Sequence, residues 1–207
     1  MDMIDAKKIM ELSIFEYSKI RETLWASVYD AVDKFLGGSR GSRGFLNDMR
    51  IAISEQYRAT ADEAWQDAGG TLPIDEDAAK YMGAAIQTEY GYVDQLAERY
   101  KLLKKDEEFD KVADTTHEAF ARADGYAKSL DKFYANVKTR SAGNKMLTFV
   151  GEDGLESCTD CQKYKGKRHR ASWWVSHNAI PPNRDFECHG YRCSHILISD
   201  DGNLWTI

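Results

Sequence analysis

The sequence predicts a mainly α protein in which a bundle or arm of long helices, residues 1–144, precedes a small α+β module, residues 145–207. Two observations carry this prediction. Apolar residues recur at three- and four-residue steps from Asp5 to about Thr139, which is the period of an amphipathic helix. After residues 141–144, Ser-Ala-Gly-Asn, the pattern changes to short extended pieces, and all four cysteines lie beyond this point. A chain of 207 residues is long enough for two such units.

The first helix is predicted over residues 5–36. Its apolar positions follow the helical period and are Ile9, Leu12, Ile20, Leu24, Val28, Val32 and Leu36. It ends at residues 37–44, where glycine and serine dominate and cannot sustain a helix. We expect a flexible connector there, with Arg40 and Arg43 in a mobile loop. The stretch lacks the Gly-Lys-Ser or Gly-Lys-Thr of a phosphate-binding P-loop, so phosphate contact is the weaker interpretation.

The second helix is predicted over residues 45–68, and Asp75 or Asp77 is expected to cap the helix that follows it. From there to about Thr139 the spacing indicates two or three further helices. Their tyrosines at helical spacing indicate core or interface packing. The mixed charges of residues 101–111 indicate solvated surface near a bend.

The composition is typical of a globular protein, with 43% hydrophobic and 30% charged residues. Eight basic and eight acidic residues lie from Lys145 onward, so the formal net charge of −6 belongs to the helical part. A net negative chain is a poor candidate for coating nucleic acid through its overall field. The sequence contains no apolar run of about 18 residues, and its start lacks a signal-peptide pattern, which together predict an intracellular product without a membrane partner.

The four cysteines form two pairs. Cys158 and Cys161 make a C-x2-C pair, and Cys188 and Cys193 follow as a C-x4-C pair. Zinc is held by thiolates at about 2.3 Å, and a two-residue gap lets one tight turn bring both sulfur atoms to one ion. Four thiolates fill a tetrahedral coordination sphere and leave no open position for substrate. The pattern therefore predicts one structural Zn²⁺ per chain.

Other interpretations of the cysteines stay open. The wider gap of the second pair leaves His189 and His195 as alternative ligands in place of one cysteine. A redox dithiol at Cys158 and Cys161 is the main rival, and disulfide pairing is a third interpretation. A zinc deaminase is excluded because no His-x-Glu precedes a Pro-Cys-x-x-Cys. The sequence also lacks a His-Glu-x-x-His motif and a recognisable nucleophile with its base, so we expect no enzymatic activity and no small-molecule substrate.

A basic cluster lies between the cysteine pairs and is followed by Trp173 and Trp174. Its five positive residues fall within eight positions and are Lys163, Lys165, Lys167, Arg168 and Arg170. A solvated loop that partly offsets the charge of a zinc tetrathiolate is the favoured interpretation. The alternative is contact with nucleic acid or an acidic partner, with Arg40 and Arg43 as helpers. The two tryptophans are expected to cover the small zinc core rather than to stack on bases.

The order of these elements resembles a known family. The last third of the chain resembles the C-terminal module of phage head morphogenesis proteins. The resemblance is carried, in order, by Cys158-x2-Cys161, Lys165-Gly166-Lys167, Trp173-Trp174, Ile180-Pro181-Pro182-Asn183 and the pair Cys188-x4-Cys193. That family includes the minor head proteins of Mu-like and related tailed phages. The resemblance covers roughly residues 145–198. The sequence departs from the common family ending, His-x-x-Cys-x-Cys, in the spacing of its last two cysteines.

The resemblance implies a low-copy virion component made in the host cytoplasm. Such a protein acts near the portal during head assembly or DNA delivery, binds portal or major capsid protein, and has packaged DNA as an additional partner. The residues alone support helices that carry a zinc-stapled terminal module, which is an architecture for binding. A nucleic-acid-binding zinc module that uses the basic cluster is the alternative function.

Overall fold

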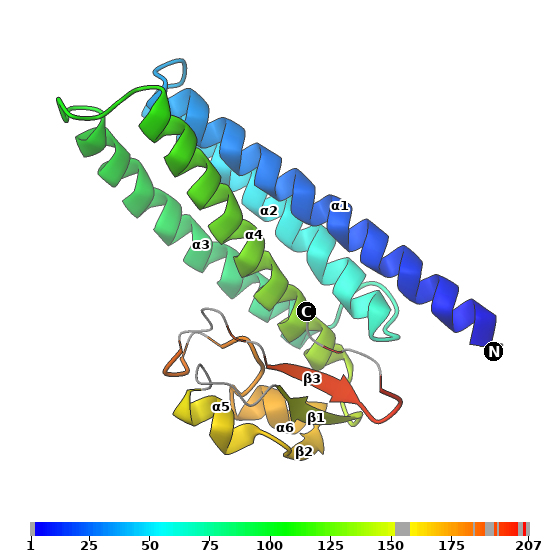
Figure 1. Ribbon diagram of the computed structural model, residues 1–207. Helices are drawn as coiled ribbons and strands as arrows, with labels where there is room; N and C mark the ends of the chain where they lie inside the picture. The colour runs from blue at the N-terminus through cyan, green and yellow to red at the C-terminus, as the bar shows by residue number, and fades with distance from the viewer. Residues whose placement is uncertain are drawn as a thin grey trace. The chain divides into compact units, whose positions relative to one another are not determined.

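A computed structural model gives the fold of the chain. It describes the backbone of residues 3–151, 158–183, 185–188, 193, 195–202 and 205, and the side chains from residue 17 onward within these ranges. The elements in chain order are α1 (Met3–Leu36), α2 (Ser42–Asp67), α3 (Glu76–Leu103), α4 (Ala113–Ser141), β1 (Met146–Val150), α5 (Thr159–Tyr164), β2 (Arg168–Arg170), α6 (Ala171–Ser176) and β3 (Ile196–Ser199). The predicted class, mainly α with a small α+β module, is confirmed (Figure 1).

The chain divides into two compact units. The first contains residues 1–63 and 79–130, and the second contains residues 64–78 and 131–207. The second unit therefore includes the end of α2, the start of α3 and the end of α4 in addition to the predicted module. Among the residues that the structure describes, no helix carries an apolar stretch long enough to cross a membrane.

Contacts between all four long helices make the first unit a helical bundle (Figure 1). The ring of Phe35 in α1 stacks on Phe45 in α2 at 4.7 Å and lies 6.4 Å from Tyr100 in α3. Tyr100 donates a hydrogen bond to Glu118 in α4. The predicted apolar stripe of α1 is buried from Leu24 onward at Leu24, Val28, Val32 and Leu36. The predicted positions Ile9 and Leu12 lie outside the described side chains.

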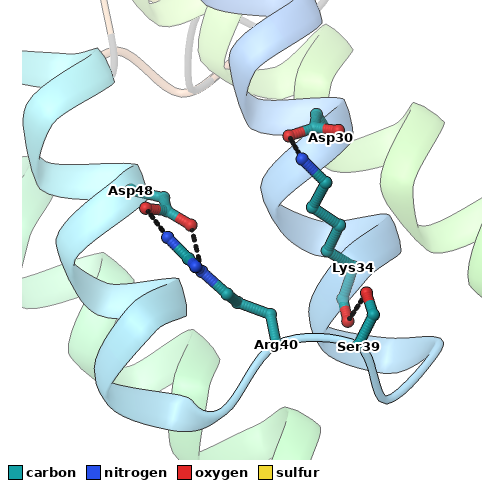
Figure 2. Close-up of polar contacts among 5 residues, drawn as sticks. All are labelled: Asp30, Lys34, Ser39, Arg40 and Asp48. Atoms are coloured by element: carbon teal, nitrogen blue, oxygen red, sulfur yellow. Dashed lines mark hydrogen bonds and ion pairs between the residues drawn. The ribbon is translucent and has the colours of Figure 1, made fainter.

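The glycine-rich connector between α1 and α2 is more ordered than the sequence suggests (Figure 2). α2 begins at Ser42, so Arg43 belongs to the helix. Arg40 donates two hydrogen bonds to Asp48, at 2.7 and 2.6 Å. This pairing raises the pKa of Arg40. The expectation that both arginines lie in the loop is therefore wrong for Arg43, whereas Arg40 lies in the connector and pairs with Asp48 of α2.

The remaining helix boundaries follow local chemistry. Asp75 caps α3, since its carboxylate accepts a hydrogen bond from the backbone N–H of Ala78 at 2.8 Å. Asp110 caps α4 in the same way by accepting from Val112 and Ala113. These two backbone donors lower the pKa of Asp110. The mixed-charge stretch predicted near a bend forms the end of α3 and the connection to α4.

The sheet of the second unit has the strand order β2-β1-β3, and both pairs are antiparallel. Leu147 pairs with His169 on β2 and with Ser199 on β3, and Phe149 pairs with Leu197 on β3. Alternation along β1 buries Leu147 and Phe149 on one face. Trp174 of α6 covers this face, is fully buried and donates its indole N–H to the carbonyl of Leu147 at 3.1 Å.

A buried ion pair joins the helix ends of the second unit. The ammonium of Lys138 lies 2.5 Å from a carboxylate oxygen of Asp67, and the two side chains are 11% and 13% exposed. The same oxygen accepts a hydrogen bond from the hydroxyl of Tyr134 at 2.6 Å. Lys138 also lies over the ring of Trp205, 5.0 Å from its centroid. The pair thus ties α2, α4 and the C-terminal segment together.

We expect Lys138→Met to lower the free energy of unfolding by about 3 kcal/mol, because it leaves the carboxylate of Asp67 buried without its counter-charge. Urea unfolding measures this change. The matched control is Lys34→Met, since Lys34 pairs with Asp30 at a site where the side chains are 50% and 59% exposed. An exposed pair of this kind contributes at most about 0.5 kcal/mol. Equal effects of the two substitutions would contradict the structural role given to Lys138.

Candidate metal centre

The first cysteine pair lies at the start of α5. Cys158 is the N-cap residue, and its sulfur accepts a hydrogen bond from the backbone N–H of Cys161 at 3.4 Å. The two-residue gap therefore closes into one tight turn, as the sequence predicts. Cys161 is 1% exposed and belongs to the hydrophobic core of the second unit. α5 is in turn joined to β1, because the N–H of Gly166 donates to the carbonyl of Phe149 at 2.9 Å.

The second cysteine pair comes to the same place. The donor atoms of Cys158, Cys161 and Cys188 all lie within 4.8 Å of one another, and so do those of Cys161, Cys193 and His195. These two groups, which we call the outer triad and the inner triad, share Cys161. None of the four cysteines forms a disulfide. The predicted alternative ligand His189 lies outside the described residues.

The distances within the triads fit a tetrahedral metal. The sulfur atoms of Cys161 and Cys193 are 3.8 Å apart. Zinc–sulfur bonds of about 2.3 Å at tetrahedral angles separate two sulfur atoms by about 3.8 Å. The cluster of cysteine and histidine donors can therefore hold a metal ion.

The pKa shifts of Cys158 and Cys161 show how closely the thiols of this cluster interact. Burial raises the pKa of Cys158, but backbone hydrogen bonds from Cys161 and Cys188 offset this effect and bring the pKa below its ordinary value. Burial and the neighbouring thiols of Cys158 and Cys193 raise the pKa of Cys161 far above its ordinary range. Buried sulfur atoms this close cannot all ionise without positive charge between them. A divalent cation bound between them would supply that charge.

Two carboxylates join the cysteine segments to each other. The backbone N–H of Thr159 donates to the carboxylate of Glu187 at 3.0 Å, and the backbone N–H of Glu187 donates to the carboxylate of Asp160 at 2.9 Å. These two hydrogen bonds, which we call the Asp160–Glu187 clasp, hold Glu187 against the first turn of α5. Because Glu187 immediately precedes Cys188, the clasp brings the second cysteine segment to the first. No sequence motif predicts the clasp, because it joins residues 27 positions apart.

The structure assigns several residues of the predicted basic cluster to local contacts. Arg168 pairs with Asp200 through two hydrogen bonds, one of them 2.9 Å long, and the pairing lowers the pKa of Asp200. The ammonium groups of Lys163 and Lys167 lie over the ring of Tyr164, at 5.2 and 5.8 Å from its centroid. Two further members differ in exposure, with Lys165 half-buried and Arg170 exposed.

Trp173 is not available as a stacking platform for a base. The ring of His169 stacks on it at 3.7 Å, and the ring of His177 stacks on it at 4.0 Å. The interplanar angles are 18° and 17°, so one imidazole lies parallel to the indole in each contact. Nucleic-acid binding by this part of the chain would therefore depend on phosphate contacts.

Comparisons with protein-family models, curated proteins and solved structures find no match to this chain. The resemblance to phage minor head proteins accordingly stays a prediction from the residues.

We expect Asp160→Ala to weaken zinc binding by about 10-fold while leaving the stoichiometry unchanged, because an outer partner that orients a ligand typically contributes 10- to 100-fold to affinity. Competition with a chromophoric chelator measures the affinity. Asp200→Ala is the matched control, since it removes an exposed aspartate of the same unit that pairs with Arg168. If Asp160→Ala bound zinc as tightly as the unmodified chain, the clasp would not position the cysteines.

Proposed function

We propose that this chain is a minor structural component of a tailed-phage or prophage head, in which one structural zinc ion fixes the C-terminal unit for docking. The observation that carries the zinc assignment is that Cys158, Cys188 and Cys193, from distant stretches of the chain, each bring a sulfur atom within 4.8 Å of the Cys161 sulfur. With four thiolates the metal has no open position, so its role is to stabilise the fold. The phage assignment is supported by the order of residues in positions 145–198.

The proposed partners are the portal protein and the major capsid protein. The helical unit offers long exposed faces, on which charges of both signs pair with each other, as in Arg50–Asp94 and Lys128–Asp124. In this proposal the protein is made in the host cytoplasm and ends in the virion head, near the portal. It has no enzymatic turnover and takes no small-molecule substrate.

Nucleic-acid binding is the second candidate, and it rests on the exposed Arg170 together with Lys163 and Lys167. The contacts described above weaken it. Arg168 is neutralised by Asp200, Arg40 by Asp48, and Trp173 is covered by histidines.

Co-expression with the portal and major capsid proteins of the same phage genome, followed by size-exclusion chromatography, tests the proposed function. We expect a complex with one of the two that survives about 0.5 M salt, because a docked protein surface depends less on charge than phosphate contacts do. The matched experiment measures binding to duplex DNA between 50 and 200 mM salt. No complex, together with DNA affinity that falls steeply over this range, would favour the nucleic-acid function instead.

A further inference from the structure

His195 is buried beside the cysteine cluster. It is 2% exposed and immediately precedes β3. Its ring lies 5.3 Å from the ring of Phe149. A Cβ atom placed on Gly151 would lie only 2.2 Å from Cδ2 of the imidazole. The absence of a side chain at Gly151 therefore makes room for the ring, and β1 fixes its orientation.

The imidazole of His195 lies beside the thiol of Cys193. Nδ1 of His195 is 3.9 Å from the sulfur of Cys193, at the long end of the range for a hydrogen bond to sulfur. The imidazole is therefore the neighbouring donor that could take the place of this thiol at a metal.

The inner triad therefore offers two donors beside Cys161. The outer triad supplies three thiols, those of Cys158, Cys161 and Cys188, which leaves one position of a tetrahedral ion to fill. Cys193 and His195 both have donor atoms within 4.8 Å of the Cys161 sulfur.

We propose that Cys193 and His195 serve the same fourth position of the metal centre, with Cys193 bound in the intact protein and His195 as a built-in substitute ligand. This inference rests on the proposed zinc site and adds a regulation to it. Loss or modification of the Cys193 thiol changes the site from four thiolates to three thiolates and one imidazole. The metal stays bound, because the imidazole is already buried and oriented and needs little reorganisation.

The test uses the full-length chain loaded with Co²⁺, whose sulfur-to-metal charge-transfer absorbance reports the number of bound thiolates. We expect Cys193→Ser to keep one metal per chain while this absorbance falls by about one quarter, from four thiolates to three. His195→Gln is expected to keep both the metal and the full absorbance. The double variant Cys193→Ser/His195→Gln should bind at least about 10-fold more weakly than Cys193→Ser alone.

Cys161→Ser is the matched control, because Cys161 belongs to both triads and its loss should remove the metal. Metal loss in Cys193→Ser equal to that in Cys161→Ser would overturn the inference. So would equal affinities of Cys193→Ser and the double variant. Glutamine keeps a polar side chain of similar size at position 195, which protects the comparison from a simple folding defect. An unmodified chain that takes up no metal would instead refute the proposed zinc site itself.

Discussion

The sulfur atom of Cys161 is the point at which three stretches of the second unit meet: the first turn of α5, the turn that carries Cys188, and the segment that leads through Cys193 into β3. The module around it has a small core, centred on Trp174 and Phe149. Such a core stabilises a fold only weakly by itself. A metal that joined these stretches would therefore contribute its binding energy directly to folding.

The parts of the structure that follow from local sequence were predictable. The helical period predicts the long helices, and the aspartates before a helical run predict a cap of α3 at Asp75 or Asp77, of which Asp75 forms it. The first cysteine pair follows from its spacing, because two intervening residues allow one tight turn. The strand at residues 146–150 follows from the change of pattern after Asn144. Each of these inferences needs only residues that are close together in the chain.

The remaining features depend on partners that spacing does not reveal. Asp48 orders the glycine-rich connector by binding Arg40, although the residues themselves suggest a mobile loop. The clasp that holds the two cysteine segments joins side chains and backbone far apart in sequence. The sequence offers His195 only as an alternative ligand. Its burial against Phe149 and beside Gly151 requires the pairing of β1 with β3.

Elemental analysis of the purified native chain and of the Cys158→Ser/Cys161→Ser variant tests whether a zinc ion holds the second unit together. Limited proteolysis after Gly143 should accompany it. We expect one zinc ion per chain, and we expect the variant to lose both the metal and the protease resistance of the C-terminal residues. A native chain without metal, whose resistance the double substitution leaves unchanged, would refute the zinc site and favour a redox dithiol at these two cysteines.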